Sequence, residues 1–129
     1  MKPWIFAGTA LICSLLSGCR DSAADAVTAT RAQNGQTVSL SAGNALIVEL
    51  PGNPTTGYEW TVTHNDASLL LPEEPGYDPD SSAIGAGGTY TFRFQALKAG
   101  AALLRMAYRR AWEPAPLETF SLAVDIQDP

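Results

Sequence analysis

The sequence has few of the side chains that carry out chemistry. It contains one histidine, His64, and two cysteines, Cys13 and Cys19. A zinc site needs about four nitrogen or sulfur ligands, so we expect no metal centre and no cofactor. A catalytic nucleophile needs a neighbouring base, and both cysteines fall in the N-terminal segment, far along the chain from His64. These shortages argue against an enzyme, and His64 is expected to be a surface residue.

Positively charged residues are also scarce. The 129 residues include 8 Lys and Arg against 13 Asp and Glu, which gives a formal net charge of −5. Such a surface repels phosphate backbones, so no nucleic-acid partner is expected. Four carboxylates crowd into one proline-interrupted stretch, at Glu73, Glu74, Asp78 and Asp80. Their spacing fits no calcium-binding loop, and we interpret the stretch as a solvated loop.

No apolar run is long enough to cross a bilayer. The longest, residues 4–16, is interrupted only by Thr9 and Ser14 and is shorter than the roughly 20 residues that a spanning helix needs. It fits the hydrophobic part of an export signal. The run ends in Leu16-Ser17-Gly18-Cys19, which is typical of a bacterial lipobox. We therefore expect a lipoprotein signal peptide at residues 1–18 and lipid attachment at Cys19. The alternative is an ordinary signal peptide that happens to contain a cysteine.

Residues 19–35 are rich in Ala, Thr, Ser and Asp and have almost no large apolar side chains. This composition predicts a flexible tether between the lipid and the folded domain. Several acyl chains on Cys19 would hold the domain firmly at a membrane. The sequence thus predicts a location in the bacterial cell envelope. Arg20 follows Cys19 where an Asp would favour the inner membrane, so we expect the outer membrane, facing the periplasm or the exterior.

The remaining residues, 36–129, have the apolar alternation of β-strands. Tyr90, Phe92 and Phe94 alternate with polar residues, so that one face of the strand is apolar. Similar alternation, separated by turns rich in Gly, Pro and Asn, is found at residues 37–40, 46–50, 58–62, 104–109 and 120–126. Short strands with one apolar face each, and no convincing helix, predict an all-β, immunoglobulin-like two-sheet sandwich of about seven strands. A domain of this length can bury only one core.

The first of three unusual loops precedes Tyr58 and has the sequence Asn53-Pro54-Thr55-Thr56-Gly57. Proline fixes φ, threonine is stiff at χ1, and glycine permits a turn that other residues avoid. Tyr58 and Trp60, pointing into the sandwich, would clamp the exit of the loop. We expect a protruding loop that has little freedom to lose on binding a partner. A plain turn is the alternative.

The second loop is Gly85-Ala86-Gly87-Gly88. A phosphate-binding loop would need a lysine after the last glycine and then a helix, whereas Thr89 and a predicted strand follow here. The loop therefore offers bare backbone that another main chain can approach closely. The alternative is a flexible loop without a partner.

The third loop begins where the alternation breaks, at Arg110. Trp112 is consequently expected in a loop, and an exposed tryptophan next to an arginine is typical of a binding hot spot. The alternative is that Trp112 folds back over the end of the sandwich.

Together these segments resemble the chagasin family, which are immunoglobulin-like inhibitors of papain-type cysteine peptidases. The stretch from Asn53 to Tyr58, with Trp60 two positions later, matches the family's first motif residue for residue. The second loop fits its Gly-x-Gly-Gly motif. Arg110-Ala111-Trp112 stands where the family has Arg-Pro-Trp, so the proline is missing. The resemblance covers the chain from about residue 36 onward.

The resemblance implies a reversible, competitive inhibitor of papain-like cysteine peptidases that catalyses nothing itself. We expect the protein to be monomeric. The three loops would form a wedge for the enzyme's cleft, with Thr55 and Thr56 over the catalytic cysteine. The backbone of Gly87 and Gly88 would line the non-primed side. Trp112 would rest on the primed side, and Arg110 would support its loop or contact the rim of the enzyme. The competing hypothesis is a non-catalytic envelope module for adhesion or assembly that uses the same loops.

Overall fold

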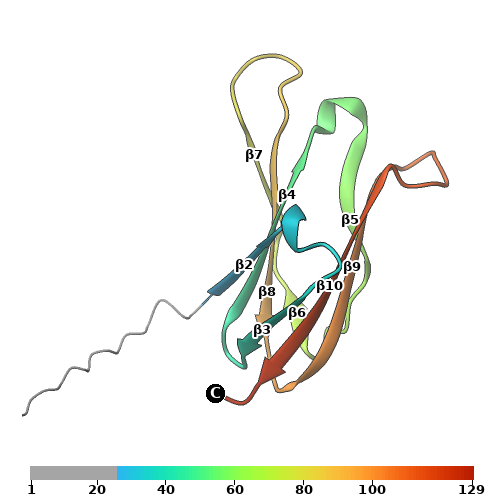
Figure 1. The fold of residues 1–129 in the computed structure, drawn as a ribbon. Coiled ribbons are helices and arrows are strands. Elements are labelled where there is room, and N and C mark those ends of the chain that lie inside the picture. The colour runs from blue at the N-terminus through green and yellow to red at the C-terminus, as the bar shows by residue number, and fades with distance from the viewer. Residues whose placement is uncertain (1–25) are drawn as a thin grey trace, which may run out of the picture.

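In the computed structural model, which describes residues 26–129, two β-sheets pack face to face (Figure 1). The expected all-β, immunoglobulin-like sandwich is confirmed. The signal peptide predicted for residues 1–18 and the predicted lipid site, Cys19, lie outside the described residues. Within residues 26–129, no helix has the length and apolar character needed to cross a membrane.

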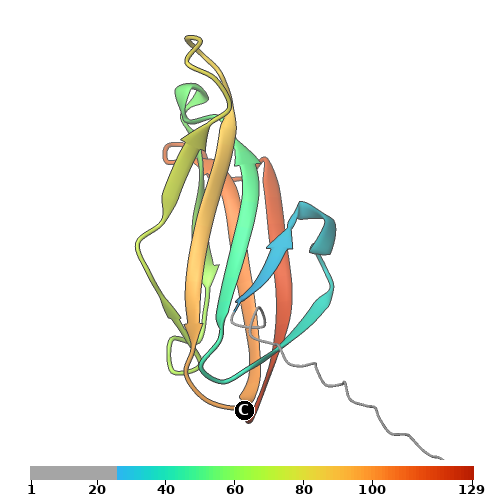
Figure 2. The ribbon, with the colours of Figure 1, turned by 90° about the vertical axis from the view of Figure 1, so that its left-hand side faces the viewer.

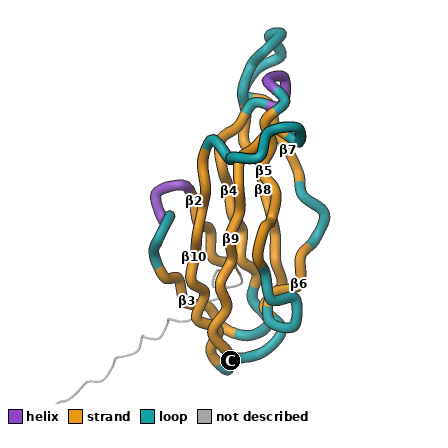
Figure 3. The backbone as a smooth tube through the Cα atoms, turned by 90° about the vertical axis from the view of Figure 1, so that its right-hand side faces the viewer, coloured by secondary structure: helices purple, strands orange, loops and turns teal. Residues whose placement is uncertain are grey.

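One sheet has four strands and the other has five. The order in the first is β3 (Thr37–Ser41), β10 (Glu118–Gln127), β9 (Gly100–Arg110) and β5 (Tyr58–His64). The order in the second is β2 (Ala26–Thr30), β4 (Ala45–Gly52), β8 (Gly88–Ala96) and β6 (Leu70–Pro72), with β7 (Gly76–Pro79) also pairing with β8. Two short 3-10 turns, η4 (Arg31–Gln33) and η5 (Pro54–Thr56), lie on the flank and at one end of the sandwich (Figure 3).

The alternating apolar residues form the core between the two sheets. Phe94, Phe120 and Leu122 are almost completely buried, and burial of one such side chain contributes about 1.5–3 kcal/mol. The other residues on the predicted apolar faces that are buried in this core are Leu46, Val48, Leu50, Trp60, Leu104, Met106, Val124 and Ile126. Val62 is exposed although it lies opposite the buried Met106. It lies near the end of edge strand β5, immediately before a register shift against β9.

The prediction of a flexible tether at residues 19–35 is wrong for residues 26–35. Residues 26–30 form strand β2, which pairs in parallel with β4 and buries Ala29 completely. Val27 and Thr28 are β-branched, which favours a strand, and the small Ala29 fits where a large side chain would not. The folded domain therefore includes residues 26–35 as well as the predicted 36–129.

The segment after β2 crosses from one sheet to the other. The η4 turn is closed by a capping box in which Thr30 and Gln33 exchange hydrogen bonds. Arg31 then forms a two-pronged ion pair with Glu118 at the start of β10, with distances of 2.7 and 2.8 Å. The ion pair therefore ties the segment that follows β2 to β10 in the other sheet.

Two further short strands, β6 and β7, lie between residues 62 and 90, where the sequence predicted no strand. Pro72 ends β6 and Pro79 ends β7. Both strands pair with one side of β8, at the margin of the sheet, where proline is tolerated because its missing N–H is not needed by a further neighbour. The described residues consequently contain nine strands instead of about seven.

Candidate functional site

The three unusual loops meet at one end of the sandwich (Figure 1, Figure 2). The strand register requires this, because Gly52 at the end of β4 faces Gly88 at the start of β8. In the other sheet, Tyr58 at the start of β5 faces Arg110 at the end of β9. The loop between β7 and β8 projects farthest from the body of the sandwich. The expectation that the loops cluster is confirmed.

The first loop is closed by its own hydrogen bonds. Asn53 caps η5: its Oδ1 accepts from the Thr55 amide at 3.1 Å and from the Thr55 hydroxyl at 2.6 Å. The Thr56 hydroxyl donates to the Asn53 carbonyl at 2.7 Å. Gly57 ends the turn with φ at 88°, a left-handed value that favours glycine. Both threonines are exposed, so the loop is a preformed protrusion, as predicted.

The second loop is joined to the first through a side chain. Asn53 Nδ2 donates to the Gly85 carbonyl at 2.9 Å. Gly87 packs against the Gly52 carbonyl, which a β-carbon at Gly87 would approach to 3.3 Å. One residue, Asn53, therefore orders its own loop and positions the neighbouring one.

Gly88 differs from the expectation that it offers free backbone to a partner. It is the buried first residue of β8, and any side chain there would collide with the Asp78 carbonyl and the Tyr77 hydroxyl. The glycine is needed for packing beneath the second loop. The accessible part of this loop lies at residues 81–87.

Arg110 joins the third loop to the first. Its Nε donates to the Thr56 carbonyl at 2.9 Å, and its guanidinium lies 4.3 Å from the centre of the Tyr58 ring. The Trp112 ring lies against Gly57, where an added β-carbon would stand only 2.6 Å from the indole. Trp112 is nevertheless 70 % exposed. The predicted loop position of Trp112 is confirmed: part of its ring covers Gly57 and the rest is available to a partner.

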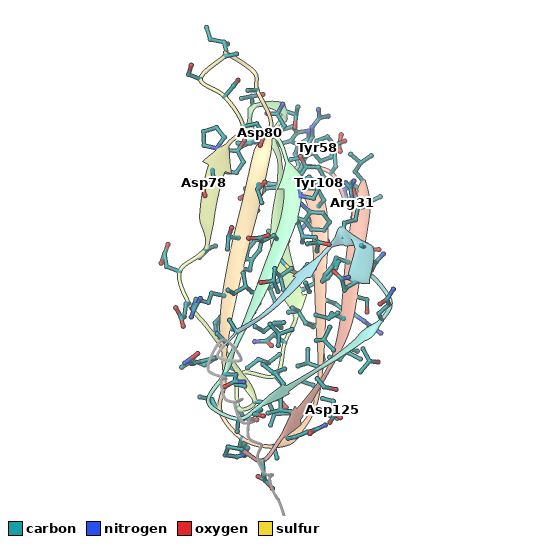
Figure 4. All side chains as sticks on the ribbon, turned by 60° about the vertical axis from the view of Figure 1, so that its left-hand side comes forward. Arg31, Tyr58, Asp78, Asp80, Tyr108 and Asp125 are labelled. Carbon is teal, nitrogen blue, oxygen red and sulfur yellow. The ribbon has the colours of Figure 1, made fainter. Side chains whose placement is uncertain are left out.

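Aromatic residues support the loops from below. The Tyr108 hydroxyl accepts a hydrogen bond from the Asn53 amide at 2.8 Å, and the Tyr108 ring stacks on Tyr58 with 5.3 Å between centroids (Figure 4). Trp60 also packs against Tyr108, with 5.1 Å between ring centroids, and its indole N–H donates to the Pro51 carbonyl at 2.9 Å. The first loop therefore stands on a packed aromatic base that holds it by its backbone.

This arrangement can recognise a surface but offers no catalytic set. His64 is exposed on β5, as expected, at the end of the strand away from the three loops. Within residues 26–129 no group of three His, Cys, Asp or Glu side chains could hold a metal ion. The model of the Chagasin family peptidase inhibitor I42 matches residues 39–124, well over half of the chain.

This chain belongs to the chagasin family.

Several known members are similar over most of the domain. Chagasin from Trypanosoma cruzi is 35 % identical over 88 residues, which cover 64 % of this chain and 80 % of that protein. Amoebiasin-1 from Entamoeba histolytica is 34 % identical over 102 residues, 76 % of this chain and 97 % of that protein. The crystal structure of a cysteine protease inhibitor from Entamoeba histolytica superposes with a TM-score of 0.72. It covers 79 % of this chain and 96 % of that one at 21 % identity, which shows a shared fold.

Two residues at the three-loop end did not stand out in the sequence. Ile84, at the second loop, is fully exposed, and its signal was an isolated large apolar residue directly before the glycines. Tyr108 was assigned only to the core face of its strand. Its role as an acceptor for Asn53 could not be seen in the alternation, because the two residues are 55 positions apart.

Proposed function

We propose that this chagasin-family protein is a reversible, competitive inhibitor of papain-like cysteine peptidases. Its three-loop end would fill the active-site cleft, with Thr55 and Thr56 nearest the catalytic cysteine. The observation that carries this proposal is that the loops form one braced unit. The Asn53–Gly85 and Arg110–Thr56 hydrogen bonds connect the first loop to both of its neighbours.

Three carbonyl groups of the first loop accept internal hydrogen bonds that would oppose cleavage. A cysteine peptidase attacks a carbonyl that lies in its oxyanion hole, within reach of the thiolate. Here the Asn53 carbonyl accepts from Thr56, and the Pro54 carbonyl accepts from the Gly57 amide at 3.0 Å. The Thr56 carbonyl accepts from Arg110. Each of these carbonyls would have to break an internal hydrogen bond before it could enter the oxyanion hole.

Preorganisation also favours affinity. Protease–inhibitor contacts typically bury about 1,600 Å² in total, and much of the cost of binding is the ordering of loops. In this protein the first loop is already a closed 3-10 turn. The exposed apolar side chains Ile84 and Trp112 stand on the two flanking loops, where they can add contact area on both sides of the threonines.

Titration of the purified protein against papain tests the proposal. We expect activity to fall stoichiometrically, competitively with substrate, and to return on dilution. The Thr55→Ala, Thr56→Ala double variant should inhibit more weakly. A matched pair, Thr37→Ala and Thr63→Ala, removes two exposed threonines from strands and should inhibit normally. Undiminished inhibition by the loop variant would refute the assigned wedge, and no effect on several such peptidases would favour the adhesion or assembly module.

We also propose that the domain is held at the bacterial outer membrane by a lipid on Cys19. The direction of β2 supports this. It runs parallel to β4, with Ala26 beside Ala45, whereas the loops follow Gly52 at the other end of β4. The chain therefore enters the sheet about 25 Å from the three-loop end, which would point the loops away from the membrane. Six residues, 20–25, would separate Cys19 from β2.

Metabolic labelling with a palmitate analogue in a bacterial host tests the anchor. We expect label on the wild-type protein and none after Cys19→Ser. Cys13→Ser is the matched control and should be labelled, because Cys13 lies in the predicted signal peptide. Labelling that survives Cys19→Ser would contradict the proposal.

A further inference from the structure

The third loop is held in shape although it has no proline at position 111; its prolines, Pro114 and Pro116, come after Glu113. Ala111 stands where the family resemblance places proline, whose ring would fix φ and limit the freedom of the loop. In this chain the Glu113 amide instead donates to the Arg110 carbonyl at 3.1 Å. Arg109 Nη2 donates to the Glu113 carbonyl at 2.9 Å. The backbone of Glu113 is thus fixed on both sides by the end of β9.

The carboxylate of Glu113 adds contacts to two other strand ends. Oε2 lies 3.4 Å from Arg110 Nη1, and Oε1 accepts from the Tyr58 hydroxyl at 3.4 Å. Its side chain is 37 % exposed. One carboxylate therefore bridges the start of β5 and the end of β9.

These contacts also act on the first loop. The Arg110 guanidinium lies over the Tyr58 ring while its Nε donates to the Thr56 carbonyl. Glu113 touches both partners of that cation–π pair. It thereby favours the one orientation of the guanidinium that connects the third loop to the first, and that leaves Arg110 5.7 Å from the Trp112 ring.

We propose that Glu113 is a positioning residue that compensates for the absence of proline at position 111. It holds Arg110 and Trp112 in the geometry that binds a peptidase. The effect on inhibition rests on the proposed function, whereas the effect on the order of the loop does not. Glu113→Ala should raise the inhibition constant for papain about three- to tenfold, the loss expected for a partly exposed carboxylate with several partners. Glu49→Ala removes an exposed carboxylate from β4 and should change nothing.

Rescue separates positioning from direct contact. If Glu113 acts by ordering the loop, Ala111→Pro should restore most of the inhibition lost in Glu113→Ala while improving the wild type only slightly. Arg110 ends β9 in an extended backbone, which is the conformation preferred before proline. Equal gains from Ala111→Pro in both backgrounds would overturn the proposal, as would a Glu113→Ala variant that inhibits normally.

A measurement without any peptidase completes the test. NMR relaxation of the Trp112 indole N–H in the full-length protein reports the order of the third loop directly. We expect Glu113→Ala to lower its order parameter and Ala111→Pro to restore it. An unchanged order parameter in Glu113→Ala would overturn the positioning role even if wild-type inhibition is observed. A lowered order parameter together with no wild-type inhibition would instead refute only the proposed function.

Discussion

Replacing Tyr108 by phenylalanine removes one hydroxyl and leaves the aromatic stack beneath the loops in place. That hydroxyl accepts a hydrogen bond from the backbone amide of Asn53 at 2.8 Å, and this bond is partly buried. Without it a backbone N–H loses its partner, which costs about 1–2 kcal/mol. For a domain of this size, each kcal/mol lowers Tm by roughly 4–8 °C. We therefore expect Tyr108→Phe to melt at least about 4 °C below the wild type.

The same change should weaken inhibition, because Asn53 orders the first loop and holds the second. The loss should reach at most about thirtyfold, since about 1.4 kcal/mol corresponds to a factor of ten and the lost hydrogen bond costs up to about 2 kcal/mol. Thermal unfolding followed by circular dichroism and inhibition of papain are the two assays.

Tyr77→Phe is a matched control. The Tyr77 hydroxyl is buried and has no hydrogen-bond partner among residues 26–129. Its removal relieves a desolvation cost, so Tm should stay the same or rise. Equal destabilisation by both changes, or a wild-type Tm in Tyr108→Phe, would refute the reasoning from hydrogen bonds.

Three further predictions concern the loops and the tyrosines beneath them. Arg110→Lys keeps the positive charge but loses the Nε hydrogen bond to Thr56 and the planar stacking on Tyr58, so inhibition of papain should weaken about tenfold. The control Arg105→Lys, on an exposed part of β9, should have no effect on inhibition. Ile84→Ser should leave Tm unchanged, because the side chain is fully exposed. It should weaken binding to the peptidase, measured by calorimetry. Normal affinity would show that Ile84 makes no contact with the peptidase. Burial raises the pKa of Tyr90 from 10 to about 12, so the folded state holds this proton more tightly than the unfolded state. Stability to urea should therefore fall as pH rises from 10 towards 12, and it should fall less in Tyr90→Phe; equal pH dependence in both proteins would count against the burial of this hydroxyl.

The fold was largely predictable because its long strands bury only one face. Strands β8, β9 and β10 have apolar residues at every second position, and these residues fill the core. Strand β2 was not predictable in the same way. Its five residues include only one large apolar side chain, Val27, and its pairing partner, β4, lies about twenty positions farther along. Composition alone indicated a tether there.

The site was predictable in its parts but not in its connections. Proline, threonine and glycine in the first loop indicated a rigid turn, and Trp112 was expected to be exposed. The contacts that make one unit of the three loops are the Asn53–Gly85 and Arg110–Thr56 hydrogen bonds. They join residues 32 and 54 positions apart, so they depend on strand register, which local sequence patterns do not specify.

The central claim is that a braced Thr-Thr turn blocks a thiol peptidase and stays intact. Prolonged incubation of equimolar protein and active papain, followed by intact-mass spectrometry and an activity assay, tests it most directly. The account predicts that papain remains inhibited and that the bonds from Asn53 to Gly57 stay uncut. Recovery of activity together with a fragment ending between those residues would show that the loop binds as a substrate, and would contradict the account.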